Sequence, residues 1–383
     1  RPAAKPHPPL RPRMRKIHMK QIRVSLRLGF FGVLSGLAPL AITLAEESPA
    51  SWTETLAVNG DLRLRYEMIR EDGTEDRDRA RFRGRIGISA ELAPDVRVGF
   101  GLATGGDDPV SNNQTFGEGF TTKDIGVHMA YVAWKFHDDW LLTAGKMEKP
   151  WFRAGGTTLV WDADLNPEGL IVAYKSRRFF GSAGSFIVAE RSDEAESRLN
   201  TVQAGVELPV SDESGITLAL SYFNYSNTIG QLPFYNDDPE GNTVDVDGNY
   251  VFDYDEIELG AQYRTRVGGW PLTVFGDYLV NTEVSREDTA YTFGVTLGEA
   301  KKARSMQFGY AWHETGADAM NSTYNDSDLA DGLTDANGHY FKARYMLREN
   351  IYFNGSFIFS EYGGFTGNEL DFDRVMLDVQ FQF

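Results

Sequence analysis

The stretch RARFRGRIGISAEL at residues 79–92 alternates strictly between two kinds of side chain. Its even positions, from Ala80 to Leu92, are small or apolar, while its odd positions include the four arginines Arg79, Arg81, Arg83 and Arg85. A period of two predicts a β-strand with one apolar and one polar face. In a soluble sheet the arginines would face water. In a transmembrane barrel they would face a water-filled lumen, because an arginine turned to lipid near the midplane costs about 2–4 kcal/mol.

Residues 1–45 differ from the rest of the chain. They carry nine Lys and Arg and no Asp or Glu, and the apolar run 28–45 ends in the small residues Thr43 and Ala45. This order is typical of a secretory signal peptide, cleaved here after Ala45. A transmembrane anchor is the alternative, but glycines and a proline interrupt an apolar span of barely sufficient length. We therefore predict an N-terminal extension and signal peptide over 1–45, and one mature domain over 46–383.

Composition narrows the class of the mature domain. Without the leader, 29 basic residues stand against 55 acidic ones, a net charge near −26, so we expect no nucleic-acid partner. The sequence has no cysteine, which excludes disulfides, thiolate metal sites and cysteine nucleophiles. No later segment reaches 18 apolar residues, so no membrane-spanning helix is expected. Its 39 glycines and 13% aromatic residues suit a β-rich protein of the cell envelope.

Alternation and turn residues mark sixteen candidate strands along the chain. The expected strands lie at 57–68, 79–92, 96–103, 125–136, 140–147, 169–175, 179–190, 199–208, 216–226, 255–266, 271–282, 289–298, 305–313, 338–347, 351–361 and 372–383. Short connections such as 93–95 and 348–350 alternate with longer, mostly acidic ones such as 227–254 and 314–337. A soluble sandwich has no reason to sort its connections this way, whereas an outer-membrane barrel requires it. The predicted fold is all-β: a closed antiparallel transmembrane β-barrel of about 16 strands over 46–383, with long extracellular loops and short periplasmic turns, and with 14 or 18 strands left open.

Several strands repeat the facing of 79–92, which places further arginines on the lumen side. The predicted pore-lining residues are Arg63, Arg65, Arg81, Arg83, Arg85 and Arg97. The strand near 125–136 changes phase between Tyr131 and Val132, which predicts a β-bulge there. The last strand alternates up to the terminal Phe383. An aromatic end of this kind resembles the signal that the insertion machinery of outer-membrane barrels reads, so Phe383 is the predicted assembly signal.

Six stretches resemble the bacterial putative porin family, which is distantly similar to the general trimeric and the phosphate-selective porins. They are GDLRLRYE at 60–67, RFRGRIGISAEL at 81–92, FGLATG at 100–105, LVWDADLNPEGL at 159–170, VFGDYLVNT at 274–282 and GVTLGEAKKARSMQFGYAW at 294–312. The resemblance implies a homotrimeric porin in the outer membrane of a Gram-negative bacterium, surrounded by lipid and lipopolysaccharide. It also implies passive diffusion of ions and small hydrophilic solutes through a water-filled pore, with no cofactor, and it identifies no particular solute.

The connection 148–168, EKPWFRAGGTTLVWDADLNPE, follows the fifth expected strand. In general porins the loop at this place folds into the lumen, so the resemblance implies a constriction that screens solutes by charge. Its predicted residues are Arg153, Asp162, Asp164 and Glu168, with the carboxylates facing the arginine ladder across the lumen. An exposed, solvated loop is the alternative. The close spacing of the three acids also admits a calcium site.

Enzyme signatures are weak, because no two histidines have zincin spacing and no GxSxG motif occurs. The best fragment for a barrel hydrolase of phospholipase or protease type is His313 with Glu314, near Ser322. A surface adhesin that uses the long loops is a third hypothesis. Acids expected in outer loops either bridge lipopolysaccharide through divalent cations or are simply solvated. They are Glu71, Asp72, Glu75, Asp76, Asp237, Asp238, Asp326, Asp328 and Asp331.

Overall fold

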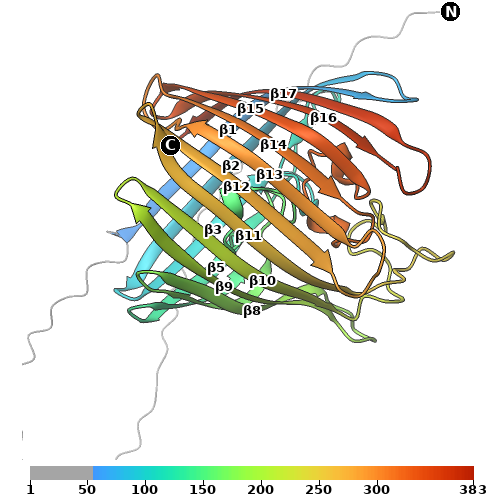
Figure 1. The fold of residues 1–383 in the computed structure, drawn as a ribbon, viewed down its shortest axis with the longest axis horizontal. Coiled ribbons are helices and arrows are strands. Elements are labelled where there is room, and N and C mark those ends of the chain that lie inside the picture. The colour runs from blue at the N-terminus through green and yellow to red at the C-terminus, as the bar shows by residue number, and fades with distance from the viewer. Residues whose placement is uncertain (1–54) are drawn as a thin grey trace, which may run out of the picture. The chain divides into compact units, whose positions relative to one another are not determined.

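The computed structural model describes residues 55–383, which form a closed antiparallel barrel of sixteen strands (Figure 1). The wall strands are β1 (Ala57–Glu71), β2 (Arg77–Ala93), β3 (Val96–Thr104), β5 (Ile125–His137), β6 (Trp140–Lys146), β7 (Glu168–Lys175), β8 (Phe179–Ala189), β9 (Ser197–Ser211), β10 (Ser214–Ser226), β11 (Tyr254–Val267), β12 (Trp270–Asn281), β13 (Thr289–Gly298), β14 (Met306–Thr315), β15 (Ala336–Arg348), β16 (Ile351–Tyr362) and β17 (Leu370–Gln382). All sixteen expected strands are present. The predicted leader lies outside the described residues.

The barrel closes because β1 pairs with β2 on one side and with β17 on the other. The β1–β17 ladder runs from Asp61 opposite Gln382 to Glu71 opposite Phe372. The other wall strands pair with their neighbours in chain order, apart from the direct β3–β5 pairing. A closed sheet leaves no edge of unpaired backbone groups toward lipid. One short strand, β4 (Gln114–Thr115), was not predicted, and it pairs with part of β2.

The facing predicted from residues 79–92 is confirmed. Arg83 and Arg65 are only 6% and 8% exposed, whereas Ile86 and Leu64 are each 44% exposed. The apolar faces therefore point outward around the wall, and the charged faces point inward. Such a large apolar outer surface is stable only when lipid covers it.

Strand β5 contains a bulge, but the predicted position was wrong. Gly101 and Leu102 of β3 pair with Met129 and Val127, so His128 is the extra residue. The outward-facing residues of β5 have odd numbers before this bulge and even numbers after it. The small Ala130 fits either face, which is why the sequence pattern showed the change of phase too late along the chain.

An aromatic cluster covers the outer wall at the end of the barrel that carries the short turns. The rings of Trp134 and Phe136 lie 5.7 Å apart, and Trp140 lies 6.3 Å from Phe136 and 4.9 Å from Tyr174. Amphipathic rings of this kind favour the interface between lipid and water.

The long connections at the other end pack against one another and against the inner wall. The connection 316–335 is mostly buried, with Ala319 and Met320 at 0% and 1% exposure. Sequence reasoning placed it on the cell exterior because of its acids, and its apolar residues were given too little weight. Within residues 55–383, the structure contains no helix that is long and apolar enough to span a membrane.

Candidate functional site

The connection 147–167 between β6 and β7 crosses the interior of the barrel. The backbone N–H of Phe152 donates to Oε1 of Gln203 at 2.8 Å, and that of Gly155 donates to Oε1 of Gln262 at 3.0 Å. These glutamines belong to β9 and β11, which follow the loop in sequence. Hydrogen bonds to two inner-wall strands fix the loop inside the barrel, so the alternative of an exposed loop does not hold.

Aromatic packing holds the loop against one side of the interior. The rings of Trp151 and Trp161 stack with their centroids 4.6 Å apart, and both meet Phe223 edge-on at 5.5 and 5.0 Å. Phe186 packs against Trp151 in the same way at 5.4 Å. These rings are buried, and burying each aromatic side chain contributes several kcal/mol at most after its entropy cost. The loop thereby fills the side of the interior formed by β8 and β10.

The predicted arginine ladder lines the opposite wall, where carboxylates neutralise much of its charge. Arg83 lies between Asp61 at 3.0 Å and Asp164 at 2.8 Å. Arg85 reaches the same two carboxylates at 2.7 and 3.5 Å. Because Asp164 belongs to the loop, these contacts tie the loop directly to the ladder. Asp164 thus faces the ladder as expected, but through direct ion pairs and not across the lumen.

A second set of ion pairs lies nearer the long loops. Arg65 donates from Nε and Nη2 to the two carboxylate oxygens of Asp378 at 2.8 and 3.1 Å, and lies 3.9 Å from Asp328. The fully buried Glu67 is contacted by the three arginines Arg79, Arg81 and Arg374. Buried charges persist only when they are paired in this way. This part of the wall is a connected network of ion pairs.

Two of the six predicted pore-lining arginines lie outside the network. Arg63 forms no ion pair among residues 55–383, and its Nη2 donates to Oδ1 of Asn113 at 2.6 Å. Arg97 donates to Glu91 at 2.6 Å near the short-turn end, where both side chains are well exposed. Exposed pairs of this kind contribute about 1 kcal/mol or less.

Asp162 and Asp164 lie two residues apart in the loop but have opposite electrostatic surroundings. Burial, together with the charge of Asp164, raises the pKa of Asp162. Burial also opposes ionisation of Asp164, but Arg83, Arg63 and Arg85 outweigh it, so the pKa of Asp164 lies well below its ordinary value. Asp164 therefore carries the charge that holds the loop to the ladder.

The other two predicted loop residues do not join this contact. Arg153 donates to the backbone oxygen of Thr157 at 3.0 Å, within the loop itself. Glu168 is the first residue of β7, and it is exposed and paired with Lys146 at 2.7 Å. The suggested calcium site is not formed, because residues 55–383 contain no group of three or more acidic or histidine side chains placed to hold a metal ion.

The connection 316–335 contacts loop 147–167 through several polar groups. The backbone N–H and the hydroxyl of Ser327 both donate to Oδ2 of Asp162, at 3.1 and 2.8 Å. The backbone N–H of Asp162 donates to the oxygen of Tyr324 at 2.8 Å. Asp326 and Asp328 of this connection are inside the barrel mouth, where Tyr340 donates to Asp326 at 2.7 Å. Neither acid is placed to bridge lipopolysaccharide on the outer surface.

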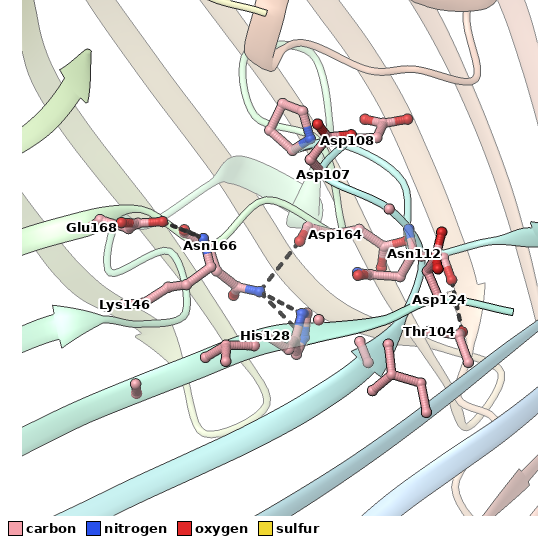
Figure 2. A pocket seen from close by; sticks show the side chains of 18 of the residues that line it. Thr104, Asp107, Asp108, Asn112, Asp124, His128, Lys146, Asp164, Asn166 and Glu168 are labelled. Atoms are coloured by element: carbon pink, nitrogen blue, oxygen red, sulfur yellow. Dashed lines mark hydrogen bonds and ion pairs between the residues drawn. The ribbon is translucent and has the colours of Figure 1, made fainter. Parts of the chain in front are cut away.

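A cavity of about 1240 Å³ lies beside Asp164, between the start of β5 and the ends of β3 and β6 (Figure 2). Figure 2 shows Asn166 facing the ring of His128, to which its amide lies at 3.0 Å, and Glu168 facing Lys146. The carboxylates that line it are Asp107, Asp108, Asp124, Asp164 and Glu168. This cavity is therefore predominantly acidic.

A second cavity of about 560 Å³ borders the same loop on the side of β11–β17. Its acidic residues, Asp328 and Asp378, both contact Arg65. The cationic residues that line it are Arg63, Arg65, Arg264, Lys342 and Arg344. Loop 147–167 thus lies between a cavity rich in carboxylates and a cavity rich in cations.

Sequence reasoning missed Arg264, Lys342 and Arg344. Each lies on the inward phase of a correctly predicted strand, and that phase was the available signal. They were overlooked because their strands carry only one or two inward-facing cations each. The stretch 79–92, in contrast, has arginine at four successive alternate positions.

The fragment considered for hydrolysis does not assemble. The hydroxyl of Ser322 donates to the oxygens of Pro239 and Asn242, each at 2.8 Å. His313 faces inward and packs its ring on Tyr340, while Glu314 accepts a hydrogen bond from Tyr291. The serine, histidine and glutamate thus lie in three separate environments, whereas a hydrolytic triad requires mutual hydrogen bonds.

Comparison with known proteins agrees with this architecture. The model of a family described as putative porin matches residues 69–243 and 238–383. A high-pH structure of Pseudomonas putida OprB is 14% identical over 86% of this chain and 95% of its own, with a TM-score of 0.61. A triple mutant of the Rhodopseudomonas blastica porin is 16% identical over 86% of this chain and all of its own, with a TM-score of 0.51. At such identities the likeness shows the fold alone. The sequence matches no curated protein.

Proposed function

The chain belongs to the putative porin family, and we propose that it is an outer-membrane channel through which ions and small hydrophilic solutes diffuse without a chemical step. The observation that carries this proposal is the closed barrel with apolar side chains outside and charged side chains inside. Such a wall is suited to lipid on one side and water on the other.

Charge screening at the level of loop 147–167 is the second part of the proposal. A solute that passes the loop meets carboxylates in one cavity and cations in the other, and low-dielectric walls focus both fields. The Arg83–Asp164 contact serves to hold the loop in place. We assign the net field of the passage to the cations that have no carboxylate partner, and less to the paired ladder.

The cellular setting is also a proposal. We infer a homotrimer in the outer membrane of a Gram-negative bacterium, inserted by barrel-assembly machinery that reads Phe383 and surrounded by lipid and lipopolysaccharide. Phe383 is 67% exposed at the end of the closing seam, where such machinery could reach it. Asp237 and Asp238 are exposed, so they are still placed to meet divalent cations at the lipopolysaccharide surface.

Planar-bilayer recording tests the channel directly. Purified barrel that shifts its gel mobility on heating is added to a bilayer, and the same amount of heat-unfolded protein serves as the control. We expect stepwise, ohmic currents from the folded sample only. Silence over repeated insertions of folded barrel contradicts the proposal. Lipid or peptide hydrolysis that disappears in Ser322→Ala would favour the hydrolase instead.

A further inference from the structure

We propose that the cavity lined by Arg63, Arg264, Lys342 and Arg344 binds small multivalent oxyanions, of which phosphate and dicarboxylates are examples. The inference rests on the channel function proposed above, because it names the class of solute that the passage holds. It differs from the sequence-based hypothesis of an arginine ladder, since three of the four residues lie on other strands.

The first step of the argument is that these four cations have no carboxylate partner. In the part of the chain that the structure describes, none of them forms an ion pair, whereas Arg65, Arg83 and Arg85 all do. The Nε of Arg63 is buried and has no hydrogen-bond partner among residues 55–383. Leaving a buried donor without a partner is unfavourable, and Arg63 is among the residues that line the cavity.

The second step is the register of the wall. Arg264 of β11 and Lys342 of β15 lie on one cross-strand row, and the residues between them are Thr273, Thr296 and Gly309. Directly paired residues point to the same face of a sheet, so this row faces the cavity. Two short threonine side chains and a glycine leave the wall recessed between two cations. Both threonines also line the cavity, and a threonine hydroxyl is able to donate.

The third step is that Arg344 and Lys342 are held in position by neighbouring side chains. The Nε of Arg344 donates to Oδ1 of Asn354 at 2.7 Å, and its guanidinium lies 4.8 Å from the ring centre of Tyr352. Lys342 lies 4.7 Å from the ring centre of Tyr340. These contacts orient both groups without neutralising them, and they leave the other guanidinium nitrogens free to donate.

The charge balance selects the class of ligand. Five cations line the cavity, and its two carboxylates, Asp328 and Asp378, are both engaged by Arg65. A guanidinium donates two parallel hydrogen bonds to planar or tetrahedral oxyanions, a geometry that a chloride ion cannot use. Several converging cations favour an anion with more than one charge. The site therefore fits a small oxyanion with two or more negative charges.

The test combines binding and conductance on the full-length barrel. Orthophosphate and, separately, succinate are titrated by calorimetry into purified protein in detergent and added to open channels at low salt. The variants are Arg264→Gln and the double substitution Lys342→Gln with Arg344→Gln. Lys302→Gln, in the exposed turn between β13 and β14, removes one charge from a residue that does not line the cavity and is the control.

We expect saturable binding and a saturable fall in chloride current for at least one of the two probes. The concentration for half-maximal effect should rise about tenfold or more in the double variant, as expected for the loss of charge-assisted contacts, and stay unchanged in Lys302→Gln. The stronger of the two probes identifies the preferred oxyanion. Equal affinity in the double variant and the native chain, or a response to chloride alone, overturns the site. Because calorimetry needs no current, binding without conductance contradicts only the channel function.

Discussion

At the scale of single residues, the charged interior divides into paired and unpaired groups. Arg83 has two carboxylate partners and is 6% exposed, whereas Arg344 has none among the described residues and is exposed. The two arginines look identical in the sequence, yet they contribute differently to the protein. A buried, paired arginine stabilises the position of the loop, and an unpaired one sets the field that a solute meets.

The first prediction concerns Arg83. Its replacement by alanine leaves the buried Asp61 and Asp164 with Arg85 as their remaining arginine partner, so the barrel should lose about 1–3 kcal/mol of unfolding free energy. Arg97→Ala removes an exposed pair and should cost about 1 kcal/mol or less. Urea unfolding of the refolded barrel in lipid measures both. Similar losses in the two variants would show that the Arg83 pairs do not stabilise the fold.

At the scale of elements, loop 147–167 depends on close packing at a backbone turn. Gly155 has φ 63°, and a Cβ added there would collide with the ring of Phe275 on β12. Gly156 has φ 72°, but its added Cβ would meet no atom within 4 Å. Alanine at either position has the same left-handed backbone cost. The two positions differ only in what the new methyl group touches.

This difference gives a matched pair of variants. Gly155→Ala should destabilise the packed position of loop 147–167 by about 1–3 kcal/mol more than Gly156→Ala does. The reason is that overpacking forces the loop away from β12. Hydrogen exchange of the amides in 147–167 measures the opening free energy in each variant, and current noise reports the same motion. If both variants exchange at the same rate, the contact with Phe275 does not hold the loop.

The next prediction concerns the end of the chain after β17, the strand that closes the barrel against β1. Phe383 exchanges two backbone hydrogen bonds with Gly60, at 3.0 and 3.1 Å, while its ring is mostly exposed. Phe383→Asp should therefore slow insertion and leave precursor in the periplasm, with little effect on the stability of the finished barrel. Phe383→Tyr keeps the aromatic ring and should insert normally. The yield of heat-modifiable barrel over time decides, and normal kinetics for the aspartate variant would contradict the assigned signal.

The wall elements were predictable from sequence, whereas the interior was not. Strands such as 79–92 show their two faces by alternation, and the short turns fix the pairing of neighbours. Loop conformation has no such period. The acids of 316–335 read as solvated charge, although Asp328 contacts Arg65 and Arg374 inside the barrel. Only long-range contacts between segments hundreds of residues apart decide that outcome, and a local pattern does not contain them.

At the scale of the whole molecule, two long connections close over the barrel mouth together. The amide of Asn242 in 227–253 donates to the backbone oxygens of Ala317 and Met320 at 2.7 and 2.9 Å. The backbone N–H of Thr334 donates to the oxygen of Glu240 at 2.9 Å. These contacts between 227–253 and 316–335 form a joint between the two connections. The stability of this joint therefore influences how solutes reach both charged cavities.

The last prediction is a pH dependence of that joint. Burial, reinforced by Asp238, raises the pKa of Glu240 to about 8 from 4.5. The folded joint thus binds a proton that the opened joint releases, so this stabilisation is complete below pH 4.5 and is lost as pH rises through about 8. Hydrogen exchange in 316–335, corrected for intrinsic rates, should show more opening at pH 9 than at pH 6.

Glu240→Gln keeps the shape of the side chain without its titration, so the difference between pH 6 and pH 9 should largely disappear in that variant. Asp247→Asn removes an exposed acid from the same connection and should retain the native pH response. An unchanged pH response in Glu240→Gln would assign the titration to another group. In that case the joint is held by Asn242 and its neighbours independently of pH.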